Sequence, residues 1–571
     1  MIQSVRSHGS ARIDTFIVAL DRLAVVRIRA VSTALGPVER SSSKEPGCFG
    51  ARSSSSHGME IHTIRDQIVD LSGQFTSRFR VAETHISTLL FVGDRVYKLR
   101  KPVQFGFLDF RERDARRLDC EREVALNRRL SPDVYLGVAS IQLDGEAIDH
   151  MVVMRRMPDS RRLADLVGQR TGSKGCLHQV AKTLAAFHDI AARSPDISTA
   201  GTGAALRAGW EANFAETEAY VGTILNRTTE IEIQLLARHW IGGHEALFNE
   251  RIAAGHVCDG HGDLQAEDMF CLDDGVRILD CIEFSDQLRY CDVIADVAFL
   301  AMDLERLGHA EAGIRFLLDY QRLADDRFPT SLVHFYIASR AYVRAKVCCI
   351  RAAQGIDDAR EEARLLHALA LRHLQRAEVI VVVVGGLPGS GKSTIAAGLG
   401  ASRNWPVLRS DEMRMALRPI PKETTAGKGH NDYSTAATAL VYGRLLREAE
   451  QLVESGESVI LDASWIDSAW RDAARAMAER TGSELFELCC SSAPEEAERR
   501  ILLRLAEHSD ESEATPKVRE AMSRSMDHWE PSAVIDTSGM KPGQAIASAI
   551  KMFSQWLIAE IDSPDRRTSA C

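Results

Sequence analysis

Hydrophobic residues change their spacing several times along the chain, and each change predicts a different kind of element. Residues 89–99 contain two apolar strands around Gly93-Asp94, which is the pattern of a β-hairpin. Residues 111–130 have the charged, amphipathic pattern of a helix, and 151–154 form another short strand. The longer segments that follow are predicted to be mostly helical at 163–250, strands and turns at 256–284, and helical again at 292–375.

The apolar run 379–384 begins a new region of the chain. Its length and its β-branched residues are typical of a strand that is buried on both faces. Two further strands are predicted at 406–411 and 458–462, and each ends in Asp. We therefore expect a domain boundary near Arg376, with the helix at 358–375 packing onto one domain or joining both.

The chain has 571 residues, which is too many for a single domain. We predict a first domain at 59–375, a second at 376–555 and a flexible tail at 556–571. Residues 1–58 are rich in Ser and Arg, poor in acidic residues, and lack the hydrophobic pattern of a core. That composition also fits a transit peptide, but we favour a disordered extension or a start codon placed too early.

A composition of 45% hydrophobic and 26% charged residues is that of a soluble globular protein. The net charge of −10 disfavours a broad nucleic-acid-binding surface, and no apolar stretch is long enough to span a membrane. None of the 12 Cys forms a C-x-x-C pair, and the ten-residue spacing of Cys271, Cys281 and Cys291 matches no zinc site. We therefore predict buried or half-buried thiols in a reducing cytosol, and a cytoplasmic protein.

Residues 386–393 match the phosphate-binding pattern G-x-x-x-x-G-K-[ST] and lie between a predicted strand and a predicted helix start. Glycines let backbone N–H groups approach a polyphosphate, and the helix N-terminus adds positive charge. Lys392 is expected to hold the β- and γ-phosphates of ATP, and the Ser393 hydroxyl to bind Mg²⁺. An ordinary glycine-rich turn does not explain Lys392-Ser393. The predicted nucleotide-binding residues are Gly386, Gly389, Ser390, Gly391, Lys392, Ser393 and Thr394.

Asp411 and Asp462 end the next two predicted strands, so both are expected beyond the carboxyl edge of the sheet, near the γ-phosphate. One of them can hold Mg²⁺ through water, and the other can take a proton from an acceptor hydroxyl. Arg414 follows Asp411 by one helical turn. Residues 498–504 form a basic helix face, which is either a cationic lid or a solvated helix with ion pairs to nearby Glu residues.

Residues 379–537 resemble the small P-loop kinases, which include gluconate kinase-like, zeta-toxin-like and polynucleotide-kinase-like enzymes. The resemblance implies that Asp411 is the base for an acceptor hydroxyl and that Arg500 and Arg504 are lid arginines. Asp462 is then the candidate Mg²⁺ ligand. A nucleic-acid 5′ end as acceptor is disfavoured by the negative net charge and by the lack of an aromatic-basic cluster.

A second group of acidic residues lies in the first predicted domain. Asp268 comes five residues after Asp263, which lies in the stretch 261–264, and Asp280 ends the next strand. Kinase-type phosphoryl transfer uses one Asp to accept a proton, and a side chain five residues later together with a second Asp to hold Mg²⁺. Taken singly, each of these residues also fits a turn cap or a solvated strand end.

The first domain resembles the aminoglycoside phosphotransferase-like family, which shares the protein-kinase fold. The resemblance covers about residues 59–375 and rests on the stretches 96–99, 122–123, 261–264, 280–284 and 292–298. It implies that Lys98 positions the α- and β-phosphates, that Glu123 holds Lys98, that Asp263 is the catalytic base and that Asp280 binds Mg²⁺. Lys98 can also be interpreted as part of an ordinary basic strand end, because Arg100 and Lys101 lie beside it and such strand ends are common. The family has Asn where this chain has Asp268, and Asp adds negative charge beside the nucleotide.

Together the two halves resemble bacterial proteins described as bifunctional aminoglycoside phosphotransferase/ATP-binding proteins. We predict an α+β protein-kinase-like domain followed by an α/β P-loop domain with a parallel sheet. The leading hypothesis is a phosphotransferase that moves the γ-phosphoryl group of ATP to a hydroxyl of a small molecule. The alternative is a nucleotide-dependent regulatory protein with a catalytically weak kinase-like module, which Asp268 motivates. The sequence predicts neither the acceptor nor the oligomeric state.

Overall fold

A computed structural model describes residues 15–20, 24–31, 79–84, 86–105, 108–143, 146–169, 173–417, 434–507 and 514–562. Its segments form two compact units. Unit 1 contains residues 1–192, 259–290 and 303–324, and unit 2 contains residues 193–258, 291–302 and 325–571. Within the predicted extension 1–58, the described residues are the strands β1 (Thr15–Leu20) and β2 (Ala24–Val31); the rest of that extension and most of the predicted tail lie outside the described residues.

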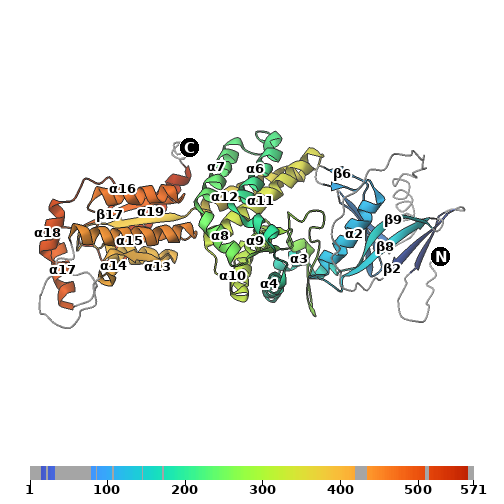
Figure 1. The fold of residues 1–571 in the computed structure, drawn as a ribbon, viewed down its shortest axis with the longest axis horizontal. Helices are drawn as coiled ribbons and strands as arrows, with labels where there is room; N and C mark the ends of the chain where they lie inside the picture. The colour runs from blue at the N-terminus through green and yellow to red at the C-terminus, as the bar shows by residue number, and fades with distance from the viewer. Residues whose placement is uncertain are drawn as a thin grey trace. The chain divides into compact units, whose positions relative to one another are not determined.

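An antiparallel sheet and one long helix organise the first part of unit 1 (Figure 1). The strand order is β1-β2-β8-β9-β5-β4-β3, and helix α2 (Arg113–Asn127) packs against β8 and β9. Gly93 turns the β4–β5 hairpin with a positive φ of 60°, which confirms the predicted hairpin. The bounds are β3 Phe79–Glu83, β4 Ser87–Val92, β5 Arg95–Arg100, β8 Tyr135–Leu143 and β9 Glu146–Arg155.

The rest of unit 1 consists of helices and a short hairpin that carries acidic residues. Strands β11 (Met269–Leu272) and β12 (Gly275–Ile278) pair antiparallel directly after the turn η4 (Ala266–Asp268). Helix α4 (Ser173–Ile190) packs against α10 (Ala310–Ala324). The remaining bounds are β6 Gln104–Phe105, β7 Leu108–Asp109, η1 Asp159–Arg161 and α3 Leu163–Val167.

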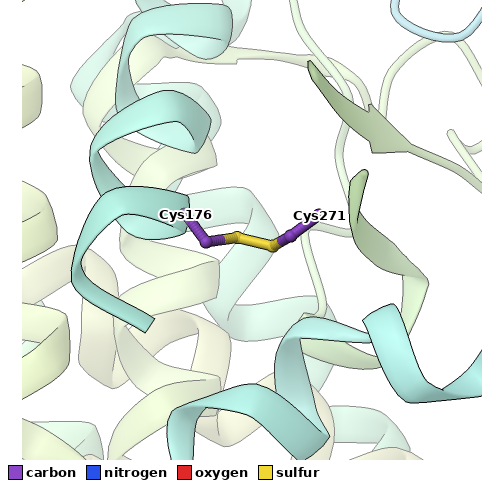
Figure 2. Close-up of a disulfide and its surroundings, with 2 residues drawn as sticks. All are labelled: Cys176 and Cys271. Carbon is purple, nitrogen blue, oxygen red and sulfur yellow. A yellow bond between two sulfur atoms is a disulfide. The ribbon is translucent and has the colours of Figure 1, made fainter. Parts of the chain in front are cut away.

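A disulfide joins Cys176 on α4 to Cys271 on β11 (Figure 2). The two Cα atoms are 5.8 Å apart, and both side chains are buried. The prediction of free thiols is therefore wrong for both Cys176 and Cys271. The spacing of the Cys residues along the chain does not indicate this pair, because its members are 95 residues apart. Cys281 and Cys291 are free, as predicted.

Most of unit 2 before residue 378 is helical, and its helices, together with α3 and α4 of unit 1, confirm the helical patterns predicted at 163–250 and 292–375. Helix α12 packs against α7 and α11 and ends at Ala377, three residues before the next strand begins. Three further elements have residues in both units, namely β10 (Val257–Asp259), β13 (Tyr290–Asp292) and α9 (Val293–Arg306). The bounds of the others are α5 Pro195–Ser198, η2 Thr199–Gly201, α6 Gly203–Thr217, η3 Glu218–Tyr220, α7 Arg227–Gly243, α8 Glu245–Ala253, α11 Thr330–Ala353 and α12 Asp358–Ala377.

The last part of unit 2 is a five-stranded parallel sheet in the order β15-β16-β14-β17-β18. All six residues of β14 are buried, which explains the unbroken apolar run in the sequence. Val381 and Val383 pack with residues of α15 and α16, whereas Val382 and Val384 pack with residues of α13 and α19. The bounds are β14 Ile380–Gly385, α13 Lys392–Arg403, β15 Val407–Arg409, α14 Ser410–Ala416, α15 Thr435–Glu454, β16 Val459–Asp462, α16 Ser468–Arg480, β17 Glu484–Ser491, α17 Pro494–Glu507, α18 Pro516–Arg524, β18 Ala533–Asp536 and α19 Pro542–Asp562.

These arrangements confirm the predicted fold classes. Unit 1 contains the antiparallel sheet, the helix α2 that packs on it and the short β11–β12 hairpin of an α+β protein-kinase-like fold, and unit 2 contains an α/β P-loop fold with a parallel sheet. Within the described ranges, no helix combines the length and apolar character that crossing a bilayer requires.

Candidate functional site

The loop between β14 and α13 has the backbone of a phosphate-binding turn. Gly386, Gly389 and Gly391 have positive φ angles of 137°, 82° and 83°. A Cβ atom on Gly386 would lie 2.2 Å from the carbonyl oxygen of Cys490, and one on Gly389 would lie 2.6 Å from that of Ala497. Glycine is therefore required at these two positions by the close approach of a neighbouring backbone as well as by φ. Helix α13 begins at Lys392, so its N-terminal N–H groups open onto this loop.

Two buried polar atoms beside this loop have no hydrogen-bond partner among the described residues. They are the Ser390 Oγ atom and the Asp462 Oδ1 atom. The other Asp462 oxygen accepts a hydrogen bond of 3.3 Å from Arg409 Nε. Leaving a buried carboxylate oxygen without a donor is costly unless a bound ligand or cation compensates it.

These atoms fit a magnesium–nucleotide complex. Asp462 pairs with Val384 across β14 and β16, so its carboxylate lies at the strand end that leads into the loop. In the described part of the chain, no three His, Cys, Asp or Glu side chains form a preformed metal site. A cation at Asp462 would therefore need the Ser393 hydroxyl, phosphate oxygens or water as its other ligands, which is how Mg²⁺ is commonly held.

A pocket beside the loop brings together some of the predicted residues of unit 2. Asp411 and Lys392 both line it, together with Arg414. Asp462 is not among its lining residues, and only 3% of it is exposed. The strand ends by themselves left the roles of Asp411 and Asp462 open, and the resemblance to P-loop kinases assigned the base to Asp411. In the structure Asp411 lines the pocket, whereas Asp462 is buried. The remaining lining residues are Pro388, Ser410, Ser464, Ala514 and Met522.

The turn after Asp462 was not predicted from the sequence. Trp465 is fully buried, and its φ of 54° is strained for a bulky side chain. Its N–H donates to the Tyr442 hydroxyl over 3.0 Å, and its carbonyl accepts from Arg471 over 2.6 Å. The preceding carbonyl, that of Ser464, accepts from the Gly386 N–H over 3.1 Å. The turn thus joins the pocket to the phosphate-binding loop, and no local sequence pattern indicates it.

Arg500 and Arg504 donate to backbone carbonyls around the loop. Arg500 Nη1 donates to the Gly389 carbonyl over 3.4 Å and to Thr537 Oγ1 over 2.9 Å. Arg504 Nη2 donates to the carbonyl of the pocket residue Ala514 over 2.9 Å. Arg500 also pairs with Glu496, and the hydrogen bonds from Arg499 and Arg500 lower the pKa of Glu496 to about 2. The role of Arg500 and Arg504 as lid arginines stays a prediction.

In unit 1, the residues predicted to form a kinase-like site lie together. Lys98 Nζ is 2.9 Å from Glu123 Oε1 and 2.6 Å from Asp280 Oδ1. Burial by itself lowers the pKa of Lys98, but Asp280 and Glu123 outweigh it and hold that pKa well above its usual value. Lys98 in turn lowers the pKa of Asp280 against the effect of burial. The predicted Lys98–Glu123 pair is present, and Asp280 completes it.

Asp263 and Asp268 lie on the loop that leads into β11. Gln265 Nε2 donates to Asp263 Oδ2 over 2.8 Å and so holds the carboxylate of the predicted base. The loop is fixed at its other end, where the Ala266 N–H donates to Asp303 Oδ2 over 2.9 Å. Burial, then Asp280, then Asp263 raise the pKa of Asp268 well above its usual value. This electrostatic crowding is what a carboxylate in place of an amide produces.

Arg100 is the residue of this site whose importance the sequence did not indicate. It is fully buried and pairs with Asp119, Glu123 and Glu283. Burial, together with repulsion from Glu123, raises the pKa of Glu283 to about 7 although Arg100 opposes this. Lys98 and Arg100 are two residues apart on β5 and therefore project from the same face of the sheet, which is the one sequence signal that could have linked them.

The two halves therefore define a class of protein with a kinase-like fold followed by a P-loop fold. A family profile described as an AAA domain matches residues 381–529. The chain is 40% identical over 463 residues to the uncharacterized protein Rv2004c of Mycobacterium tuberculosis, covering 80% of this chain and 92% of that protein, and the same values hold for the uncharacterized protein Mb2027c of Mycobacterium bovis. The chain belongs to the family of these mycobacterial proteins.

Several solved structures are similar to one half or the other. The Mycobacterium tuberculosis APS kinase CysC in complex with AMPPNP and APS is 21% identical, covers 31% of this chain and 98% of its own, and has a TM-score of 0.24. A choline/ethanolamine kinase family protein from Mesorhizobium loti is 13% identical, covers 55% and 98%, and has a TM-score of 0.34. The GDP and kanamycin complex of APH(2")-IIIa is 15% identical, covers 55% and 98%, and has a TM-score of 0.35.

Proposed function

We propose that this protein is an ATP- and Mg²⁺-dependent phosphotransferase that acts on a hydroxyl group of a small molecule. The observation that carries the proposal is the pocket of unit 2, where Lys392 and Asp411 face the same space beside a glycine loop. A phosphate-binding lysine and a carboxylate on one pocket are what transfer from a nucleotide to a hydroxyl needs. A cytoplasmic location, where ATP is available, completes the proposal.

In the P-loop half, each residue has a separate task. The N–H groups of the loop and Lys392 bind the phosphates and orient the γ-phosphoryl group. Asp411 accepts the proton of the acceptor hydroxyl as that oxygen attacks. Asp462 and Ser393 would hold Mg²⁺, which supplies charge neutralisation of the phosphates when it is bound. Arg414, on the same pocket, orients the acceptor or offsets negative charge there.

In the kinase-like half, the proposal assigns the same chemistry to different side chains. Lys98, held by Glu123, binds the α- and β-phosphates, and Asp263, held by Gln265, accepts the acceptor proton. Asp268 and Asp280 would hold Mg²⁺. Their mutual repulsion fits this role, because like charges that converge are stabilised by a cation between them.

The experiment is ATP turnover by the full chain with Mg²⁺ and a panel of small hydroxyl acceptors. Lys392→Ala is expected to abolish one part of the turnover and Asp263→Ala another. Lys551→Ala, which removes an exposed lysine of α19, is the matched control and should leave turnover unchanged. If neither Lys392→Ala nor Asp263→Ala changes turnover with any acceptor, the proposal is wrong.

A second candidate function is supported by Asp268. A carboxylate in place of an amide adds negative charge where phosphates would bind, so the kinase-like half would sense a ligand rather than turn it over. Isothermal titration separates the two functions: this regulatory protein binds nucleotide in the Lys392→Ala chain without any turnover. Turnover in that chain with an added acceptor would contradict the regulatory function.

A further inference from the structure

Arg100, the last residue of β5, makes contacts to three separate parts of unit 1. Its side chain is fully buried. Nε donates to Asp119 over 2.6 Å, and Nη1 donates to Ser87 Oγ on β4 over 2.8 Å. Nη2 donates to Glu123 over 2.6 Å and also to Glu283. One guanidinium therefore joins two strands of the sheet, helix α2 and the segment that follows Asp280.

The two contacts to helix α2 restrict how that helix can move. Asp119 and Glu123 are four residues apart, so they lie on one face of α2 in successive turns. A rotation or shift of α2 away from the sheet would break both ion pairs and leave buried carboxylates unpaired. Leaving a buried charge without its partner is among the most costly local changes in a protein.

The contact to Glu123 also fixes which of its oxygens faces Lys98. Glu123 Oε2 accepts from Arg100 over 2.6 Å, and Oε1 accepts from Lys98 over 2.9 Å. With Oε2 occupied, the carboxylate cannot rotate without losing Arg100. Lys98 consequently keeps one fixed partner on α2 and one on the Asp280 segment.

Charge balance explains why a guanidinium fits this position. Lys98 and Arg100 face four carboxylates, so the cluster is short of positive charge. A guanidinium has five N–H donors in a planar fork and can reach several carboxylates at once, which a lysine ammonium does less well. The four carboxylates are Asp119, Glu123, Asp280 and Glu283.

We propose that Arg100 is a positioning residue that keeps Lys98, Glu123 and Asp280 assembled for a nucleotide before any nucleotide binds. It acts through Glu123 and the Asp280 segment and does not touch the phosphates itself. The inference rests on the proposed function, in which Lys98 binds the phosphates of a nucleotide in unit 1. Its consequence is that Arg100 controls the affinity for the phosphates but not the affinity for the nucleoside.

The test measures two ligands on the full-length Lys392→Ala chain, in which the P-loop lysine is absent. Isothermal titration gives the dissociation constants for Mg·AMPPNP, which has phosphates, and for adenosine, which has none. Arg100→Met is expected to weaken Mg·AMPPNP roughly tenfold, the scale of one lost charge-assisted hydrogen bond, and to leave adenosine unchanged. Arg100→Lys keeps the positive charge but lacks the planar set of N–H donors, so it should also weaken Mg·AMPPNP and leave adenosine unchanged. If Arg100→Met does not fold, Arg100→Lys provides the test.

Arg116→Met is the matched control. Arg116 is also a buried arginine of this unit, on α2, but it pairs with Asp149, and its described hydrogen bonds do not include one to Glu123. This variant should lower the melting temperature, but it should not weaken Mg·AMPPNP relative to adenosine. A purely structural role for Arg100 would make its variants behave in this way.

Lys98→Met distinguishes failure of the inference from failure of the proposed function. If Lys98→Met weakens Mg·AMPPNP while neither Arg100 variant does, the positioning role of Arg100 is wrong and the nucleotide site stands. If Lys98→Met has no effect, or if the Lys392→Ala chain binds neither ligand, the proposed nucleotide site of unit 1 is wrong and the inference falls with it.

Discussion

The two candidate sites of this chain position a lysine in opposite ways. Lys392 follows a loop whose shape is fixed by glycine backbone, and no described side chain forms an ion pair with it. Lys98 lies in a buried network and is paired with two carboxylates already. The P-loop site thus keeps unsatisfied polar atoms for a ligand, whereas the kinase-like site has its charges engaged with one another.

This difference teaches where each site is sensitive to change. A site made of backbone is damaged by adding atoms where another backbone approaches closely. A site made of paired charges is damaged by removing one partner, because the others stay buried.

The first prediction concerns the side chain with the most direct chemical task in the P-loop half. Asp411→Asn should lower kcat by about 10²–10⁴-fold, the usual contribution of a general base, because an amide cannot accept the proton. The dissociation constant for nucleotide should stay the same, since backbone and Lys392 bind the phosphates. Turnover is measured with an acceptor from the panel, and binding by titration. Unchanged turnover would remove Asp411 from the reaction.

The second prediction asks whether only one site depends on a covalent cross-link. Reducing the Cys176–Cys271 disulfide should destabilise unit 1 by about 2–4 kcal/mol, the usual effect of losing such a bond. Nucleotide binding at the P-loop should persist, because the disulfide lies in unit 1. Thermal unfolding of the wild type and of Cys271→Ser, each with and without reductant, measures the effect, and only the wild type should respond to reductant. A reductant-dependent loss of stability in Cys271→Ser itself would contradict the assignment.

The third prediction tests the backbone character of the P-loop site. Gly386→Ala should destabilise the P-loop half by about 2–4 kcal/mol, because its Cβ would meet the Cys490 carbonyl and its φ is positive. Gly391→Ala is the matched control, since its φ is also positive but the nearest atom to its Cβ would be 3.6 Å away. The control should lose only about 1 kcal/mol, the cost of φ alone. Equal losses in urea unfolding would show that close approach is not the cause.

The fourth prediction tests the crowded charges of the kinase-like site through pH. Because the pKa of Asp268 is raised on folding, the folded state binds a proton more tightly, and stability falls as pH rises from the unfolded pKa towards the folded one. Asp268→Asn removes this loss. In Mg²⁺-free buffer it should be more stable than the wild type by about 1 kcal/mol or more at neutral pH, and about equally stable at about pH 3 and below, where the Asp is mostly protonated in both states.

Two outcomes would contradict the fourth prediction. A gain in stability that is the same at every pH would mean that the substitution acts through packing and not through charge. A loss at neutral pH would mean that the Asp268 carboxylate is satisfied in the folded protein. Asp274→Asn, which changes an exposed Asp of the neighbouring turn, is the matched control and should show little change at any pH.

Much of the fold followed from local patterns. The spacing of hydrophobic residues correctly predicted the β4–β5 hairpin, helix α2 and the buried strand β14. The parallel sheet could be expected because apolar strands alternate with helical segments after residue 378. The pairing of Cys176 with Cys271 could not, because the two residues belong to elements that only the folded chain brings together.

The candidate sites differ in how far the sequence revealed them. The glycine loop could be recognised because its residues are contiguous and act through their own backbone. Lys98, Glu123 and Asp280 could be proposed from their spacing, but each had a plain alternative as a single residue. The sequence did not indicate the roles of Trp465 and Arg100. The strained φ of Trp465 and the complete burial of Arg100 result from packing, and neither can be predicted from the residue type.

The sequence by itself determined that a phosphate-binding loop exists, which residues form it, and which fold classes the two halves have. Those properties are local, since they depend on residue type and spacing along a few neighbouring positions. Only the tertiary structure decided that Asp411 lines the pocket while Asp462 is buried, that Arg100 holds Glu123, and that Cys271 has a partner. These depend on distances between segments far apart in the chain, which are fixed when the core packs and not before.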